Sequence, residues 1–215
     1  MTLTLTPYTD VIKDEMLREI ARRGDVRAFP ALSTLLREGD TTDAFYILLS
    51  GRVKVFGTDS KGREVVYNTM GPGEYFGELS LDGSSRSASV QCLEPVKCVM
   101  VRGTDMREFL GQHPDFALHL IRHLIALLRR STDSVKSLAL DDVYSRLAKL
   151  LQEMAEPDVS GRLVVPHKLT QQDLAERVGA SREMISRILQ QLVKGGYIER
   201  QGRRMVLLKK LPPGW

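Results

Sequence analysis

The segment 77–89, GELSLDGSSRSAS, holds side chains that could bind a phosphodiester. Such an anion is matched by the planar double donor of an arginine, assisted by small hydroxyl or backbone donors. Arg86 and Ser87 supply these groups, and the glycine and two serines at 83–85 would let the backbone approach closely. Glu78 could accept a hydrogen bond from a ribose hydroxyl. These residues predict an anion-binding loop, and a plain surface loop is the alternative that they leave open.

The segment 170–196 predicts two short helices joined by a glycine turn. Thr170 and Asp173 have the spacing of a capping box, which would begin the first helix. Gly179 is placed to end that helix, and Ser181 can cap the second one. Apolar residues at helical spacing would bury one side of the second helix: Ile185, Ile188, Leu189 and Leu192. Two helices about such a turn form the unit whose second helix enters the major groove of DNA.

Four polar residues would face outward at the start of this second helix: Arg182, Glu183, Ser186 and Arg187. Arginine can donate two hydrogen bonds to guanine, and glutamate can accept one from cytosine. The next segment, 197–210, predicts a hairpin that turns at Gln201-Gly202, with Arg203 and Arg204 beside the turn. Together these features predict a winged helix-turn-helix. The alternative is an amphipathic helical hairpin whose charged face is only solvated.

The net charge of +4 is concentrated in the C-terminal third of the chain. Residues 141–215 hold 13 Lys and Arg against 9 Asp and Glu, whereas the charges of residues 1–140 cancel. A local basic excess is typical of proteins that bind a phosphate backbone, although many basic faces are merely solvated.

Composition places the chain among soluble globular proteins, with 42% apolar and 27% charged residues. The sequence has no run of about 18 apolar residues that would span a membrane. The N-terminus lacks the basic start and apolar run of a secretory signal, which favours the cytoplasm. Cys92 and Cys98 lie six apart in a strand-like stretch, and we expect them to be small buried hydrophobic residues that share one face.

The elements expected to position the anion-binding loop are short strands. The segment 29–106 alternates apolar runs with glycine turns, a pattern typical of a sandwich or barrel. A double-sheet jelly roll is the best single prediction. The fold class is therefore predicted to be α+β, with a β jelly-roll domain over 1–113, a dimerisation helix over 114–140 and a winged helix-turn-helix over 141–215.

The predicted central helix carries a regular apolar seam. Its members are spaced alternately four and three residues apart: Ala117, Ile121, Leu124, Leu128, Ser131, Val135 and Leu138. Such a seam packs either in a dimer or against the chain's own domain, and its regularity favours the dimer. Because a polar seam residue lowers stability, Ser131 suggests a place where the seam does more than pack.

Catalysis is not favoured by the sequence. A metal-dependent jelly-roll enzyme would need ligands on its strands, but every histidine lies outside the strand region: His113, His119, His123 and His167. His119 and His123 are four residues apart on the central helix, and we interpret them as surface or packing residues. Neither a nucleophile–base pair nor a Walker-type loop is present, so we predict no enzyme activity and no metal site.

The stretch 179–189, GASREMISRIL, closely resembles the recognition element of the cyclic AMP receptor protein (catabolite activator) family of transcription regulators. The resemblance implies that three residues contact bases: Arg182, Glu183 and Arg187. It implies phosphate contacts near three others: Thr170, Gln172 and Ser181.

The residues GEL and then RSA in the segment 77–89 resemble the phosphate-binding cassette of cyclic-nucleotide domains. This resemblance implies ribose-side contacts from three residues: Gly77, Glu78 and Leu79. It implies phosphate contacts from Arg86 and Ser87. A hydroxyl pair on the family's dimer helix meets the purine base, and the matching positions here are Ser131 and Thr132.

The resemblance covers nearly the whole chain. It implies a homodimer that binds palindromic TGTGA-like sites, as an activator, with cyclic AMP as its allosteric effector. It also implies a contact with RNA polymerase through the exposed loop 157–161. The alternative is a regulator of the same architecture that is ligand-independent or that senses another signal, such as redox state or haem.

Overall fold

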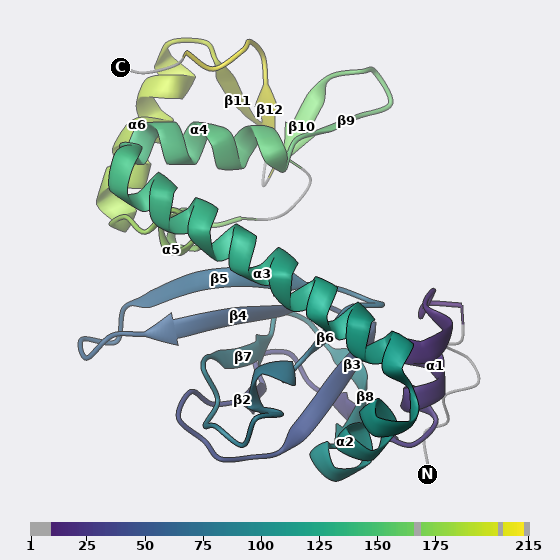
Figure 1. The fold of residues 1–215 in the computed structure, drawn as a ribbon. Coiled ribbons are helices and arrows are strands. Elements are labelled where there is room, and N and C mark those ends of the chain that lie inside the picture. Colours follow the sequence, from purple (N-terminus) through teal and green to yellow (C-terminus); the bar gives the residue numbers. More distant parts are fainter. Residues whose placement is uncertain (1–9, 166–168, 202–203, 213–215) are drawn as a thin grey trace. The chain divides into compact units, whose positions relative to one another are not determined.

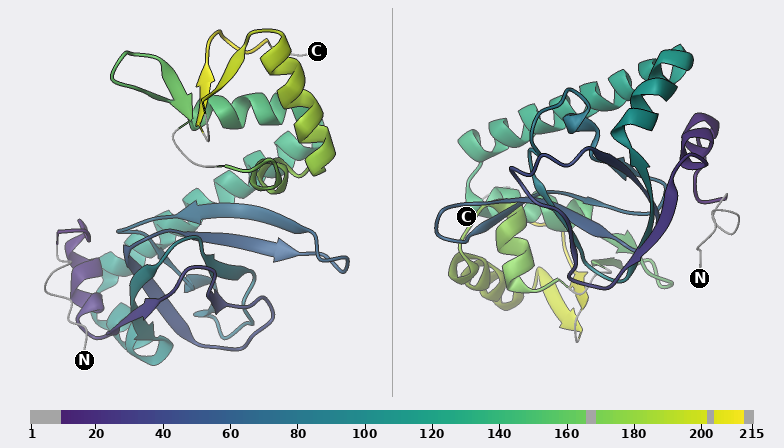
Figure 2. Two further views of the ribbon diagram at one scale, coloured as in Figure 1. Left: turned by 180° about the vertical axis from the view of Figure 1, so that it is seen from behind. Right: turned by 90° about the horizontal axis from the view of Figure 1, so that it is seen from below.

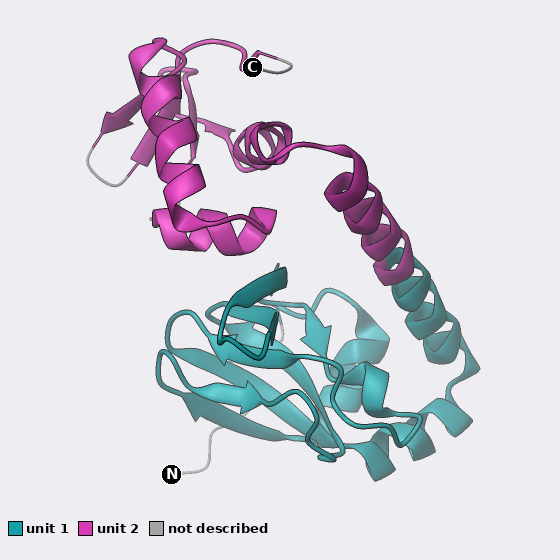
Figure 3. Ribbon diagram, turned by 90° about the vertical axis from the view of Figure 1, so that its left-hand side faces the viewer, with its two compact units in different colours: residues 1–126 teal, residues 127–215 magenta. Residues whose placement is uncertain are grey.

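The computed structural model describes residues 10–165, 169–201 and 204–212. The chain divides into two compact units, residues 1–126 and 127–215, which Figure 3 shows in different colours. The division falls inside one long helix, α3 (Pro114–Leu140). The first part of this helix therefore belongs to the first unit, and the remainder belongs to the second.

The first unit contains two antiparallel four-stranded sheets, as the jelly-roll prediction requires (Figures 1 and 2). One sheet has, in order, β1 (Asp25–Phe29), β8 (Val96–Arg102), β3 (Ala44–Ser50) and β6 (Tyr75–Phe76). The other has, in order, β2 (Thr34–Leu36), β7 (Ser89–Cys92), β4 (Val53–Thr58) and β5 (Glu64–Met70). The strands begin earlier than expected, at Asp25, and the last of them ends at Arg102.

Strand β3 is buried on both faces because it lies between two cores. Tyr46 and Leu48 point into the core between the sheets, whereas Phe45, Ile47 and Leu49 point to the opposite face. This two-residue alternation explains why an almost continuously apolar segment forms a strand rather than a helix.

The prediction that Cys92 and Cys98 share one face of one strand is wrong. Cys92 ends β7 in one sheet, whereas Cys98 lies within β8 in the other, because the chain turns between them at 93–95. Both thiols are nevertheless fully buried in the core between the sheets, as expected for small hydrophobic residues.

Three helices pack on the outer face of the sheet that contains β3. They are α1 (Glu15–Ala21), α2 (Gly103–Gln112) and the first part of α3. Figure 1 shows α1 and α2 beside the start of α3. Phe109, Phe116 and Leu120 join this helical layer to the apolar side chains of the sheet. The sequence patterns had not indicated α1 or α2.

The second unit is a winged helix-turn-helix, as predicted. Besides the end of α3, it contains the helices α4 (Val143–Glu153), α5 (Gln171–Val178) and α6 (Arg182–Lys194). Its strands form one antiparallel sheet in the order β11 (Ile198–Gln201), β12 (Arg204–Leu207), β10 (Leu163–Val165) and β9 (Glu156–Pro157). The β11–β12 hairpin is the wing, and its tip at 202–203, with Arg203, lies outside the described residues.

Candidate functional site

Arg86 is buried, although it follows an exposed loop. Only 4% of the residue is accessible, and its guanidinium bonds to the protein's own oxygens. Nη1 donates to the carbonyl of Gly77 (3.0 Å) and to Oγ of Ser80 (2.6 Å). Nη2 donates to the carbonyl of Ala44 (2.7 Å), and Nε donates to Oγ1 of Thr42 (3.1 Å). The loop thus folds around the arginine that was expected to bind a phosphate.

The hydrogen-bond partners of Arg86 are all neutral. Among the described residues, no carboxylate lies within ion-pair distance of its guanidinium; Asp43, Glu78 and Asp40 act on it only at longer range. Burial lowers the pKa of Arg86, since desolvation disfavours its charged form. A buried cation without a counter-ion is energetically unfavourable, and an anion of fitting size would relieve it.

Gly77 and Glu78 form the other side of this site. Gly77 has φ of 94°, and a Cβ at this position would lie 2.6 Å from the carbonyl oxygen of Ala44. Only glycine fits both restraints, so the turn into the short 3₁₀ helix Glu78–Ser80 depends on it. Glu78 is 9% exposed, and burial raises the pKa of its carboxyl, partly offset by the positive charge of Arg86.

The carboxyl of Glu78 faces the first part of α3. Its Oε1 lies 4.0 Å from Nε2 of His123, and the His123 ring packs on Tyr75 with 4.5 Å between the ring centroids. From the sequence, His123 is expected only to be a surface or packing residue. Its proximity to Glu78 could not be found locally, because the two residues are far apart in the sequence and meet only through the packing of α3.

The other predicted loop residues are exposed. Leu79 is 51% accessible, and Ser87 is also exposed. The loop tip is held by Asp82, which accepts hydrogen bonds from the backbone N–H (2.9 Å) and hydroxyl (2.8 Å) of Ser84. Beside the tip is a depression of about 330 Å³, bounded in part by Thr41, Ser80 and Arg107. The structure therefore brings Gly77, Glu78 and Arg86 together, whereas Leu79 and Ser87 are exposed.

The predicted seam of α3 is largely uncovered in the single chain. Among its apolar members, Ile121, Leu128, Val135 and Leu138 are each at least half exposed. Ser131 and Thr132 are exposed in the second unit, where the Thr132 hydroxyl donates to the carbonyl of Leu128 (3.0 Å). That Ser131 and Thr132 act together with the loop 77–89 on one ligand stays a prediction.

The two helices of the helix-turn-helix begin with the predicted caps. The Thr170 hydroxyl accepts from the backbone N–H of Asp173 (3.1 Å), and the Asp173 carboxylate accepts from the backbone N–H of Thr170 (2.7 Å). Gly179 ends α5 with φ of 64°, and the Ser181 hydroxyl accepts from the backbone N–H of Met184 (3.2 Å). These local bonds set where α6 begins, and so which side chains it presents.

The start of α6 has the expected side-chain exposure at three of the four positions predicted to face outward. Arg182, Glu183 and Arg187 are exposed, whereas Ser186 is half-buried beside the apolar stripe. The stripe itself is buried as expected: Ile185, Ile188, Leu189 and Leu192. On α5, Gln172 is exposed, and its amide donates to Glu176 (2.8 Å).

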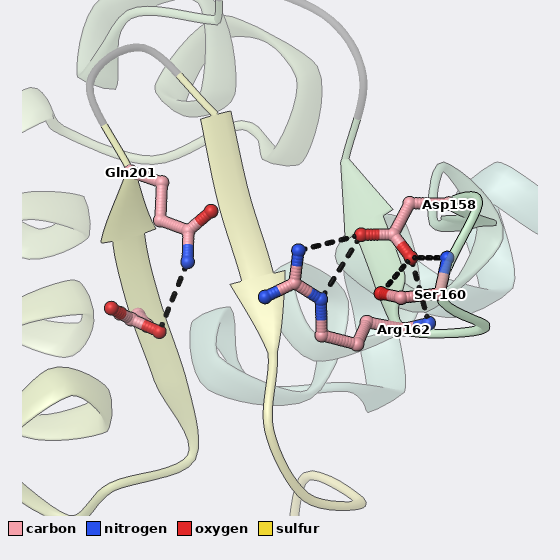
Figure 4. A network of polar contacts seen from close by, with 5 residues as sticks. Asp158, Ser160, Arg162 and Gln201 are labelled. Atoms are coloured by element: carbon pink, nitrogen blue, oxygen red, sulfur yellow. Dashed lines mark hydrogen bonds and ion pairs between the residues drawn. The ribbon is translucent and has the colours of Figure 1, made fainter.

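A network of hydrogen bonds closes the tip of the loop between β9 and β10 (Figure 4). Asp158 Oδ1 accepts from the backbone N–H (2.8 Å) and hydroxyl (2.6 Å) of Ser160, and Oδ2 accepts from Nε (3.0 Å) and Nη2 (2.8 Å) of Arg162. These bonds hold the pKa of Asp158 well below its ordinary value. Val159, between the bonded residues, is fully exposed.

The fold and these sites define a regulator in which a ligand-binding β-roll is joined to a winged helix-turn-helix. Residues 26–113 match the family described as "Cyclic nucleotide-binding domain", and residues 145–212 match the "Crp-like helix-turn-helix domain". The chain belongs to the cyclic AMP receptor protein family of DNA-binding transcription regulators.

Named relatives agree with this assignment. The chain is 34% identical over 183 residues to the CRP-like cAMP-activated global transcriptional regulator of Mycobacterium tuberculosis. The aligned residues cover 83% of this chain and 82% of the relative. It is 30% identical over 191 residues to the cAMP-activated global transcriptional regulator CRP of Pasteurella multocida, covering 85% and 89%.

Solved structures show the same fold. The c-di-GMP-responsive global regulator CLP of Xanthomonas campestris matches with a TM-score of 0.78 at 23% identity, covering 90% of this chain and 98% of that protein.

In the part of the chain that the structure describes, no helix is both long and apolar enough to cross a membrane.

Proposed function

We propose that this chain is a cyclic AMP-responsive transcription activator that binds palindromic TGTGA-like DNA as a homodimer. The observation that carries the proposal is the buried guanidinium of Arg86, which has neutral partners only and lies near the buried carboxyl of Glu78. A cyclic nucleotide offers complementary groups, an anionic phosphodiester for the arginine and a ribose hydroxyl for the glutamate. The two bacterial relatives are both named as cAMP-activated regulators, which points to the same nucleotide.

Binding would require a local rearrangement of Arg86. The four hydrogen bonds described above use four of the five N–H donors of its guanidinium, so a phosphate must replace some of them. The exposed Ser87 would supply a hydroxyl, and the backbone at Gly77 and Leu79 would face the ribose. The nucleotide shifts the protein between states only by its difference in affinity for them, and the exchange of Arg86 partners supplies such a difference.

The exposed seam of α3 supports a second copy of the chain as its partner. A helix that leaves Leu128 and Val135 about two-thirds exposed at heptad spacing buries them when two such helices pair. In the dimer, Ser131 and Thr132 would meet the purine base from both subunits. The two copies of α6 would then enter successive major grooves about 34 Å apart, with Arg182, Glu183 and Arg187 at base edges.

The hydrogen-bonded tip of the β9–β10 loop supports a contact of residues 157–161 with RNA polymerase. A fully exposed valine held on a hydrogen-bonded turn is pre-organised for docking, because little conformational freedom remains to be lost. The polymerase is the partner that the family resemblance suggests for this loop.

The decisive experiment pairs titration calorimetry, using cyclic AMP and cyclic GMP, with a gel shift on a TGTGA palindrome. We expect cyclic AMP to bind and to increase DNA retention by the natural chain. Arg86→Ala should abolish the nucleotide response and leave the dimer intact, whereas Ser84→Ala, at the exposed loop tip, should keep the response. An Arg86→Ala variant that still responds to nucleotide would show that the pocket is misassigned.

One observation favours the alternative of a ligand-independent regulator. Four of the five guanidinium N–H groups of Arg86 donate to protein oxygens, so these four groups need no anion as their acceptor. Redox sensing through the cysteines is disfavoured, because burial raises the pKa of Cys92 to about 11 and that of Cys98 to about 12. Thiols of this kind are unreactive near neutral pH. DNA retention that is the same with and without nucleotide would favour the ligand-independent regulator.

A further inference from the structure

The first part of α3 places two histidines, one helical turn apart, opposite carboxyl groups of the first unit. His123 Nε2 lies 4.0 Å from Oε1 of Glu78, and His119 Nδ1 lies 3.5 Å from Oδ2 of Asp14. Both imidazoles pack against Tyr75, with 4.5 Å between ring centroids for His123 and 6.0 Å for His119. The Tyr75 hydroxyl is buried and has no hydrogen-bond partner among the described residues. These five residues form a partly buried polar cluster.

The charges around His123 come from several elements. Glu78 faces it from the 3₁₀ helix, Tyr75 from β6 and His119 from the preceding turn of α3. Asp14, which caps α1, faces His119, and Arg86 acts on Glu78 at longer range. The side chain of His123 is only 22% exposed and that of Glu78 only 7%. Salt and water therefore screen this pair much less than a surface pair.

We propose that binding of an anionic nucleotide beside Arg86 and Glu78 is coupled to the uptake of a proton by His123. The inference rests on the proposed function, because the cyclic nucleotide is the anion that it requires. The nucleotide brings a negative charge into a pocket that already holds the carboxyl of Glu78. Histidine is the side chain whose charge ordinarily changes near neutral pH, so the added negative charge favours its protonated form.

Linkage fixes the direction of the effect. If the nucleotide favours the protonated imidazole, protonation favours the nucleotide by the same factor. Affinity is therefore highest at acidic pH and falls as the pH rises through the range in which histidine loses its proton. For a coupling of about tenfold between the two events, the affinity is about sixfold higher at pH 6 than at pH 8. The same coupling gives an uptake of about half a proton per site at pH 7.

Titration calorimetry of the intact chain tests this coupling without any mutation. Cyclic AMP is titrated at pH 7 in phosphate and in Tris, whose ionisation enthalpies differ. The difference between the two binding enthalpies, divided by the difference between the ionisation enthalpies, gives the number of protons taken up. We expect uptake of about half a proton per bound nucleotide.

Two variants then locate the proton. His123→Gln should still bind cyclic AMP but lose the uptake and the pH dependence. His113→Gln is the matched control, because that imidazole lies 3.8 Å from Glu19 and stacks on Phe109 instead of facing Glu78. This variant should keep both the proton uptake and the pH dependence of binding. If His123→Gln does not fold, proton NMR of the natural chain gives the same information. One histidine resonance should then titrate at higher pH when cyclic AMP is bound.

The outcomes separate the two proposals. No binding heat with cyclic AMP or cyclic GMP in either buffer would overturn the proposed function, and the proton coupling with it. Binding with no proton uptake, or with no displaced histidine resonance, would overturn the coupling alone. Uptake that persists in His123→Gln would also overturn it, because another group of the pocket would then take the proton.

Discussion

Two buried side chains of opposite charge in one pocket are unfavourable for the stability of the ligand-free protein. Arg86 is surrounded by neutral oxygens, and the carboxyl of Glu78 is desolvated strongly enough to raise its pKa. Their mutual attraction offsets only part of this penalty, since burial remains the largest influence on each. Such residues are retained where function requires them, and replacing them exchanges function for stability.

Glu78→Gln should make this exchange measurable. Because the pKa of Glu78 is raised in the folded state, the fold binds its proton more tightly than the unfolded chain does. Stability therefore falls as pH rises above the ordinary value of 4.5 and through the raised folded value. At pH 7 the amide should stabilise the nucleotide-free protein, as measured by denaturant unfolding, and should weaken cyclic AMP binding.

The gain from Glu78→Gln should vanish near pH 4, where the natural carboxyl is itself protonated. Glu38→Gln is the control, because Glu38 is exposed in the same unit and should leave stability and binding unchanged at either pH. Equal stability of Glu78→Gln and the natural chain at pH 7 would contradict the assigned desolvation of this carboxyl.

The ends of helices α5 and α6 are fixed by local hydrogen bonds, and the two helices pack together because they share one buried core. The reciprocal capping box at Thr170 and the Ser181 cap each contribute about 1 kcal/mol. Leu174 and Val178 of α5 are buried with Leu189 of α6 in one core. Signals of this kind lie within a few residues of one another, so caps, turn glycine and buried stripe were all predictable from the sequence.

The contacts of α1, α2 and the first part of α3 were not predictable in the same way. These helices are placed by the outer face of a sheet whose strands come from distant segments, and the sequence gives no local sign of that packing. The burial of Arg86 and its bonds to Thr42 and Ala44 depend on the same long-range pairing. The residues of the anion-binding loop could thus be named from the sequence, whereas their orientation and the partner His123 could not.

Leu128→Glu tests the role of the α3 seam. Leu128 is 68% exposed, so the substitution should leave the fold of the single chain intact. In a dimer it would place two carboxylates in the apolar seam, and the dissociation constant should rise by at least about a hundredfold. Sedimentation at a series of protein concentrations measures the dissociation constant of the dimer.

Leu140→Glu is the control for the seam. Leu140 is 74% exposed and lies two residues beyond Leu138, about 200° further round the helix and away from the seam. It should leave self-association unchanged. A Leu128→Glu variant that associates as tightly as the natural chain would show that the seam is not the dimer interface.

In the proposed dimer, the positive charge sets the strength of DNA binding, and the two-fold symmetry sets which DNA sites are bound. The excess of positive charge belongs to residues 141–215, which contain the helix-turn-helix, while residues 1–140 are balanced. DNA affinity should therefore fall as salt is added, mainly because the positive charges of residues 141–215 are screened. Affinity from charge alone does not depend on DNA sequence. In the proposed homodimer, discrimination between sequences would come from base contacts repeated in two half-sites at a fixed separation.

The spacing of the half-sites is the sharpest test of this arrangement. Two recognition helices joined through one dimer interface fit half-sites one helical turn apart, and five added base pairs turn the second half-site to the opposite side of the duplex. The second helix then loses its contact, and affinity should fall about a hundredfold, to that of a single half-site. A duplex with the original spacing and a changed spacer sequence is the control and should bind almost normally. Equal binding at both spacings, measured by gel shift with cyclic AMP present, would mean that the two helices act independently, since only a rigid pairing of the subunits makes the distance between half-sites matter.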